Sequence, residues 1–111
     1  MIKVLRPRSR MRRLARPVRP MLERLGLVQE LSFGLNRLDR KLMKYLRYRG
    51  GLFVEAGANN GISQSNTLYF ERYLGWRGLL VEAIPELAEA CRKNRPNSIV
   101  EQCALVSAAD N

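Results

Sequence analysis

Short apolar runs alternate with helix-length segments through the second half of the chain. The unbroken run at residues 52–56 predicts a strand of the kind that is buried on both faces of a parallel sheet. Similar runs at residues 78–81 and 99–103 predict two further strands. Helices are predicted between them, the first ending at Gly75 and the second beginning at Pro85. The order strand, helix, strand, helix, strand indicates an α/β fold with a parallel sheet.

The two predicted helices carry recognisable end signals. Ser63 or Ser65 can cap the first helix, which is expected to run to about Leu74. The second helix has glutamates near its beginning and basic residues near its end, in the order that the helix dipole favours. Pro96 and Asn97 are expected to end it.

The first half of the chain has a different pattern. Residues 20–25, closed by Gly26, predict a short helix that exposes apolar side chains. Residues 35–48 predict a longer helix, because apolar side chains recur along one face. These side chains are Leu35, Leu38, Leu42, Tyr45 and Leu46.

Charge separates the two halves. The 111-residue chain has a net charge of +10, and residues 1–50 hold 15 Lys or Arg against 3 Asp or Glu, whereas residues 51–111 hold 5 against 7. We therefore divide the chain into a basic, partly disordered leader, residues 1–34, and a second unit, residues 35–111. The leader is either a solvated arm or, through residues 1–20, a segment that binds an anionic membrane or glycan surface.

Other functions of the leader are disfavoured. Its arginine-rich part has no aromatic residues to stack on bases, so nucleic acid is not an expected partner. Three prolines in the first 20 residues disrupt the amphipathic helix of an organellar signal, and no apolar run reaches membrane-spanning length. A cytoplasmic location, with peripheral membrane association as an option, fits two cysteines that lack metal-ligand spacing. The chain has no His, which excludes zinc catalysis and predicts no metal site.

Residues suited to ligand binding lie where the first predicted strand ends. Glu55 is followed by a turn that contains Gly57 and Gly61, residues that allow a sharp turn and, we expect, a close start of the next helix. The second strand ends in Glu82, 21 residues beyond Gly61. An acidic residue at about this offset is placed to accept hydrogen bonds from ribose hydroxyls. The spacing therefore predicts a nucleoside site.

Two absent motifs narrow the range of possible ligands. The chain has no Gly-x-Gly-x-x-Gly for a dinucleotide pyrophosphate and no Gly-x-x-x-x-Gly-Lys-Ser/Thr for a triphosphate. The remaining pattern suits S-adenosylmethionine, which has a ribose and a cationic amino-acid tail but no phosphate. In this interpretation Glu55 faces the ammonium group, the backbone amides of the turn face the carboxylate, and Glu82 binds the ribose.

Longer motifs resemble the FkbM-type family of S-adenosylmethionine-dependent methyltransferases, over about residues 36–107. The resemblance is carried by residues 51–67 (GLFVEAGANNGISQSNT), 74–87 (LGWRGLLVEAIPEL), 94–97 (NRPN), 103–106 (CALV), 39–42 (DRKL) and 44–46 (KYL). Asn59 stands where many such enzymes have glycine, and Asn60 stands where the family pattern leads us to expect Asp.

The resemblance implies the first half (β-α-β-α-β) of a Rossmann-like methyltransferase sheet of seven strands. It implies methyl transfer to an oxygen, on a hydroxyl of a sugar or secondary metabolite, so the expected partner is a small-molecule or glycan acceptor. Cys103 is expected either to contact the adenine or to be a small buried side chain. The residues expected to bind the cofactor are Glu55, Ala56, Gly57, Ala58, Asn59, Gly61, Ser65, Glu82, Ala83, Cys103 and Ala104.

Two other interpretations remain open at this point. Because about 60 residues belong to the cofactor unit, the chain is expected to be an incomplete enzyme that lacks activity by itself. Alternatively, the basic leader is the functional part and acts at an anionic surface.

Overall fold

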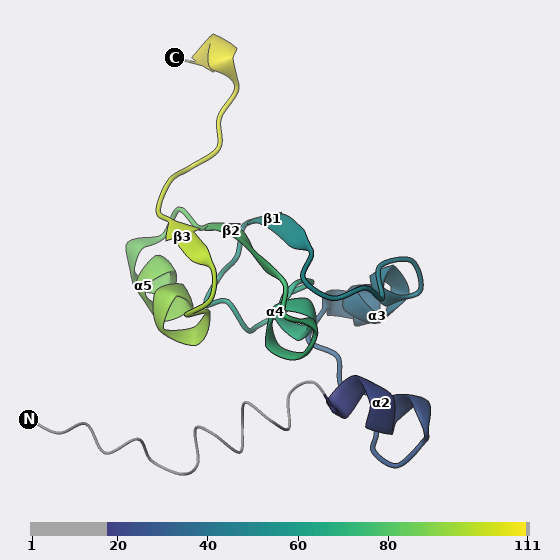
Figure 1. Ribbon diagram of the computed structural model, residues 1–111. Helices are drawn as coiled ribbons and strands as arrows, with labels where there is room; N and C mark the ends of the chain where they lie inside the picture. Colours follow the sequence, from purple (N-terminus) through teal and green to yellow (C-terminus); the bar gives the residue numbers. More distant parts are fainter. Residues whose placement is uncertain (1–17, 111) are drawn as a thin grey trace, which may run out of the picture.

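A computed structural model describes residues 18–110, and its strands form one small parallel sheet (Figure 1). Residues 1–17, the first half of the basic leader, lie outside the described part. In chain order the elements are α2 (Arg19–Arg24), a 3-10 helix (Leu35–Arg37), α3 (Leu38–Met43), β1 (Leu52–Ala56), α4 (Leu68–Leu74), β2 (Arg77–Val81), α5 (Pro85–Asn94), β3 (Ile99–Glu101) and a 3-10 helix (Ala108–Asp110).

The sheet has the predicted α/β arrangement. Its strand order is β1-β2-β3, and both pairs are parallel. The β-α-β-α-β order of a Rossmann-like sheet is therefore confirmed. β3 ends at Glu101, two residues before the predicted end, so Cys103 lies beyond the strand. α5 begins at Pro85 as predicted and ends at Asn94, just before the predicted stop.

Both crossing helices cover the same face of the sheet. Cys91 of α5 packs in a cluster with Leu80 and Val100, while Phe70 of α4 belongs to a second cluster, and Phe53 of β1 contacts both. Burying each large side chain in such clusters stabilises the fold by about 1.5–3 kcal/mol relative to exposure. Sheet and helices thus form two layers (Figure 1).

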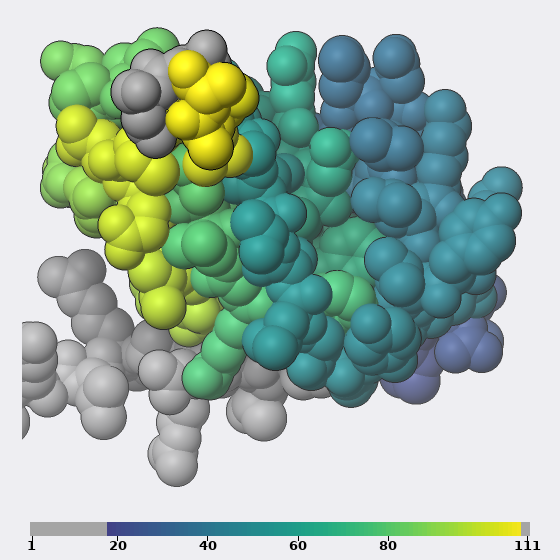
Figure 2. All heavy atoms as spheres, turned by 90° about the horizontal axis from the view of Figure 1, so that it is seen from above, coloured from purple at the N-terminus to yellow at the C-terminus, as the bar shows by residue number. Residues whose placement is uncertain are grey.

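The opposite face of the sheet is exposed, so the prediction that the first strand is buried on both faces is wrong. Side chains alternate along β1, with Leu52 82% and Val54 72% exposed, and Ile99 of β3 is 65% exposed. In the view from above, teal atoms from the β1 part of the chain lie at the molecular surface (Figure 2). An unbroken apolar run does not reveal this, because coverage depends on where the helices pack.

The predicted short helix near residue 20 is present as α2, and Met21 and Leu25 are exposed as expected, whereas Leu22, also expected to be exposed, is half-buried. The chain after it packs onto α4: Leu31 and Phe33 contact the cluster around Phe70. Part of the predicted leader therefore belongs to the folded body. No helix within residues 18–110 is both long and apolar enough to cross a membrane.

The predicted helix over residues 35–48 is mostly wrong. Asn36 and Arg37 have left-handed backbone angles, with φ of 53° and 57°, and these angles separate a single 3-10 turn from the six-residue α3. The buried Asp39 carboxylate accepts hydrogen bonds from the Ser32 hydroxyl and the Phe33 backbone N–H, at 2.5 and 2.8 Å. These local bonds connect α3 to the preceding segment, in competition with a longer helix.

The predicted apolar face of that helix is correspondingly divided. Leu42 and Leu46 pack against the aromatic cluster of α4, whereas Leu35, Leu38 and Tyr45 are exposed. The helical period therefore identified some core residues but overestimated the length of the helix.

Candidate functional site

A glycine turn, residues 57–61, follows β1 and contains three left-handed residues. Gly57, Asn59 and Gly61 have φ of 69°, 56° and 83°. A Cβ built on Gly57 would meet no atom within 4 Å, so its backbone faces open space and glycine is needed there for its conformation. An Asn at position 59 is compatible with the left-handed angle, as the sequence suggested.

Gly61 has a different role from the expected one. A Cβ at Gly61 would lie 2.7 Å from Cγ of Arg95 and 3.0 Å from Sγ of Cys91. The helix that approaches Gly61 is therefore α5, whereas the next helix along the chain, α4, begins seven residues later at Leu68. The expectation that Gly61 allows the next helix to start close to the sheet is wrong.

Glu82 connects the tips of β1 and β2. Its side chain is buried, and Oε2 accepts a hydrogen bond from the Asn59 backbone N–H at 2.7 Å while Oε1 accepts one from the Ile84 N–H at 3.1 Å. A backbone bond from the Ala58 N–H to the Val81 oxygen, at 2.9 Å, runs beside it. A carboxylate has about four acceptor positions, so Glu82 retains capacity for further donors. The spacing argument thus placed Glu82 correctly beside the turn.

Asn60 organises the second half of the turn through its amide. Oδ1 accepts hydrogen bonds from the backbone N–H groups of Ile62 and Ser63, at 2.9 and 2.8 Å, and Nδ2 donates to the Ser63 hydroxyl at 3.1 Å. The amide NH2 donates the third bond, and a carboxylate could replace it only by accepting a bond from the Ser63 hydroxyl. The Asn60 side chain thus holds the second half of the turn in place.

A buried arginine cluster lies directly behind the turn. Arg95 is fully buried, and its guanidinium donates to Oε1 of Glu71, the Gly61 carbonyl, the Ser65 hydroxyl and the Thr67 hydroxyl, at 3.1, 3.1, 3.1 and 2.9 Å. These partners come from α4, from the turn and from the loop between them. Arg95 thereby fixes the turn against the helix layer.

Glu55 belongs to the same cluster. Its carboxylate accepts hydrogen bonds from the Ser65 hydroxyl, the Asn66 N–H and the Thr67 hydroxyl, and it lies 3.7 Å from Nη1 of Arg95. The Glu55 side chain is 11% exposed. Its predicted contact with a ligand ammonium group stays a prediction, because its nearest partners belong to the protein.

The N-cap residue of α4 is Thr67, which makes no side-chain capping bond, so neither predicted serine is the N-cap, but Ser65 binds the beginning of the helix from two residues earlier. Its hydroxyl accepts hydrogen bonds from the backbone N–H groups of Thr67 and Leu68, at 3.3 and 3.1 Å, where α4 begins. Gly75 ends α4 in the left-handed conformation, as predicted. Ser63 instead bonds to Asn60, so of the two candidates only Ser65 contacts the beginning of α4.

The predicted site residues fall into three groups. Gly57, Ala58, Asn59, Gly61 and Glu82 come together at the turn, with Ala56 and Ala83 exposed at its two strand tips. Glu55 and Ser65 lie in the buried arginine cluster behind it. Cys103 and Ala104 lie on an exposed segment after β3. The alternative of a small buried side chain is wrong for Cys103.

The two cysteines should therefore differ in reactivity. Burial raises the pKa of the Cys91 thiol, whereas Cys103 is exposed. With a small aromatic disulfide reagent at neutral pH, we expect Cys103 to react promptly and Cys91 to react mainly after unfolding, because the thiolate is the nucleophile. Mass spectrometry of the digested protein measures each site, and the Cys103→Ser variant is the control. Equal rates at both cysteines would contradict the placement of Cys91 beneath the sheet.

Sequence reasoning missed the roles of Arg95 and Glu71. Glu71 lies on α4 between Phe70 and Arg72 and is only 5% exposed, and its Oε1 also accepts a short hydrogen bond from the Ser98 hydroxyl. An acidic residue among the apolar and aromatic side chains of this helix was a weak signal of a buried partner, because Arg72 beside it is also charged. Its partner, 24 residues away, could not be read from spacing.

Comparisons with known proteins give one structural likeness. No family model matches the chain, and no curated protein matches it. A TehB-like SAM-dependent methyltransferase from Corynebacterium glutamicum is similar in structure, with a TM-score of 0.49 and 14% identity, over 86% of this chain and 46% of that chain. The chain thus spans about half the length of that neighbour. A likeness at this score does not assign a function, so the case for one depends on the residues of the site.

Proposed function

We propose that the glycine turn binds S-adenosylmethionine and that the chain carries the cofactor-binding part of a methyltransferase. The main support for this proposal is that two features lie next to each other. The left-handed backbone of Gly57 faces open space, and the buried Glu82 carboxylate lies at the adjacent strand tip. Parallel α/β sheets bind nucleoside ligands at this edge. The sequence resemblance to FkbM-type methyltransferases supports the same ligand.

The chain's own groups fit the two ends of that cofactor. Glu82 has acceptor capacity for the ribose hydroxyls and is held in place by the Asn59 and Ile84 N–H groups. The turn offers backbone N–H donors for the carboxylate of the amino-acid tail. We assign the ammonium group to Glu55 through water, since that carboxylate is already surrounded by protein donors. Cys103 and Ala104 remain the proposed adenine contacts.

The proposed reaction is methyl transfer to a hydroxyl oxygen of a sugar or secondary metabolite. The bound sulfonium would supply the methyl group in an in-line displacement, so the protein's task is mainly to orient the two reactants. Within the described residues, the rigid parts for this task are the turn and the arginine cluster behind it. The acceptor class is suggested by the family resemblance alone.

Removing the Glu82 carboxylate should weaken cofactor binding. A hydrogen bond to a charged group is worth about 1.5–3 kcal/mol, so Glu82→Ala should reduce affinity for S-adenosylmethionine about tenfold to a hundredfold. Titration calorimetry measures the affinity, and thermal unfolding checks that the variant is folded. The matched control is Glu86→Ala, which removes an exposed carboxylate from the first turn of α5. Equal affinity of wild type and Glu82→Ala for S-adenosylmethionine would show that Glu82 does not bind the cofactor.

Position 57 tests the turn itself. Gly57→Asn should fold nearly as well as wild type, because Asn tolerates the left-handed region, whereas a β-branched Val does not. Either side chain would enter the open space that the proposal gives to the cofactor, so Gly57→Asn should lose S-adenosylmethionine affinity alone. Gly57→Val should therefore lose both stability and S-adenosylmethionine affinity. The two variants are compared by thermal unfolding and calorimetry. Normal binding by Gly57→Val would show that the turn is not the pocket.

A further inference from the structure

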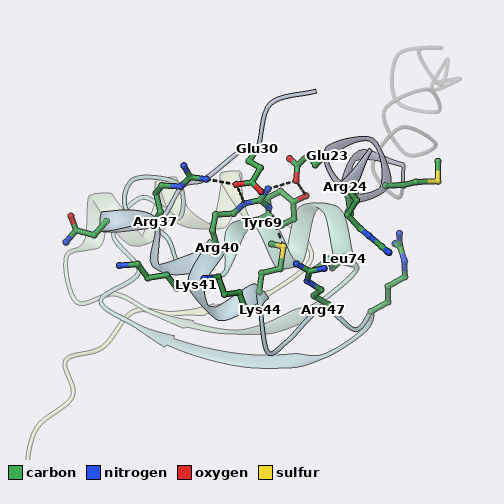
Figure 3. Close-up of a pocket in the computed structure, with 15 residues that line it drawn as sticks. Glu23, Arg24, Glu30, Arg37, Arg40, Lys41, Lys44, Arg47, Tyr69 and Leu74 are labelled. Atoms are coloured by element: carbon green, nitrogen blue, oxygen red, sulfur yellow. Dashed lines mark hydrogen bonds and ion pairs between the residues drawn. The ribbon is translucent and has the colours of Figure 1, made fainter. Parts of the chain in front are cut away.

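A second, basic cavity of about 790 Å³ lies between α2, α3 and α4 (Figure 3). Its lining includes seven basic and two acidic side chains, and it contains none of the residues of the glycine turn. Figure 3 shows Lys41, Lys44 and Arg47 along one side, with Glu23, Arg40 and Tyr69 grouped opposite them. A volume of this size is within the range of about 300–1,000 Å³ found for small-molecule sites.

The basic side chains form a stripe along α3 and the residues that flank it. Positions 37, 40, 41, 44 and 47 are all Arg or Lys, and of these only Arg40 and Lys41 lie within α3. Leu42 and Leu46 point the other way and pack against the core. Like charges gathered on one short segment repel one another, so stability does not explain the stripe.

Two glutamates neutralise part of this charge. The nearly buried Glu23 carboxylate lies 2.5 Å from Nη2 of Arg40 and accepts a hydrogen bond from the Tyr69 hydroxyl at 2.7 Å, while Glu30 pairs with Arg37 at 2.6 Å. Burial opposes ionisation of Glu23, but hydrogen bonds from Arg40 and Tyr69 outweigh it and hold its pKa below the usual value. Burial, reinforced by Glu23, raises the pKa of Tyr69, so the hydroxyl keeps its proton. These contacts give the pocket a fixed wall.

The remaining charge is not compensated. Lys41, Lys44, Arg47 and Arg24 line the cavity, and among residues 18–110 no carboxylate pairs with any of them. Lys and Arg side chains that converge on one concave site attract a compact anion. Met21 and Leu74 add apolar surface to the same lining, which suits an organic ligand better than a bare ion.

We propose that this cavity binds the phosphate groups of a small organic molecule, at a site separate from the glycine turn. The phosphates would contact Lys41, Lys44 and Arg47, and the apolar lining would contact the rest of the ligand. The shared chemistry is a phosphate ester, carried either by a soluble metabolite or by a lipid headgroup. The proposal goes beyond methyl transfer and does not depend on S-adenosylmethionine.

Inorganic pyrophosphate is the probe that tests the site. It is titrated into the full chain at low salt and low protein concentration, without S-adenosylmethionine, and binding is followed by Trp76 fluorescence or calorimetry. We expect saturable binding, and the double variant K41Q/K44Q should bind about tenfold or more weakly. The charge-matched control is R92Q/K93Q on α5, which should bind within about twofold of wild type. Both variants change exposed side chains, and thermal unfolding verifies their folding.

Vesicles distinguish the two sources of phosphate. Pelleting with phosphatidylcholine vesicles that contain phosphatidylglycerol should fall in K41Q/K44Q, relative to R92Q/K93Q, if the site takes lipid headgroups. Pyrophosphate binding together with pelleting that is equal in both variants would support a soluble phosphate ester. The proposal is overturned if wild type does not bind pyrophosphate, or if the two double variants lose affinity alike.

Discussion

Arg95→Met is expected to destabilise the fold by about 3–5 kcal/mol, the usual cost of removing one partner from a buried ion pair. Arg95 has no exposed surface, and its guanidinium lies 3.1 Å from Glu71 and 3.7 Å from Glu55. Met keeps much of the side-chain volume but provides no donors. Two carboxylates would then remain in the interior without their cation.

The same substitution should also loosen the candidate cofactor site. Arg95 donates to the Gly61 carbonyl and to the Ser65 hydroxyl, so it connects the glycine turn to the beginning of α4. An acceptor left unsatisfied in the interior costs about 1–3 kcal/mol. Domains of this size have little stability to spare, so we expect Arg95→Met to be largely unfolded at 37 °C.

Urea unfolding, followed by circular dichroism, measures the effect. The matched control is Arg92→Met, one turn earlier on α5, where the side chain is exposed and pairs weakly with Glu89 at 3.4 Å. That variant should change stability by less than about 0.5 kcal/mol. The stability of Arg95→Lys should lie between those of the two Met variants, because Lys keeps the positive charge but lacks the planar guanidinium with its several N–H donors. If Arg95→Met unfolded at the same urea concentration as wild type, the buried contacts of Arg95 would contribute nothing to stability.

Local signals in the sequence were sufficient for the sheet and for the turn. Apolar runs, together with Pro85 and Gly75 at helix ends, placed the strands and helices of the second half to within about two residues. The distance from Gly61 to Glu82 correctly implied that these elements meet at one sheet edge, because parallel strands bring their carboxyl ends together. Strands, helix ends and the turn depend on residues close in sequence, and the meeting of the turn and Glu82 depends on the length of the connection between two parallel strands.

Features that need distant segments could not be predicted. Arg95 is satisfied by the turn, the following loop and α4, up to 34 residues away, and no single spacing reveals that set. The left-handed Asn36 and Arg37 interrupt a regular apolar period for reasons that lie in packing around Asp39. The extent of β3, and with it the position of Cys103, depends on a strand with only three residues in the ladder.

Exposure of one whole sheet face is the largest difference from the sequence-based expectation. Val54, Leu79 and Ile99 lie in register across the three strands and form an apolar row. Val54 and Ile99 are 72% and 65% exposed. Within the described residues β1 also pairs with β2 alone, so its other edge has unpaired backbone groups. Exposed apolar patches and open strand edges both favour association between chains.

We therefore expect the purified 111-residue chain to self-associate as its concentration rises, and Val54→Lys to weaken this association about tenfold to a hundredfold. A Val side chain contributes about 1.5–3 kcal/mol when it is buried, and Lys at the β1 end of the row would place a charge in the associated interface. Size-exclusion chromatography with light scattering, over a range of concentrations, measures the equilibrium. Leu105→Lys is the matched control, because Leu105 is 69% exposed but lies after β3, off the sheet face. A wild-type chain that stays monomeric at high concentration, or equal effects of the two variants, would refute the role of this face.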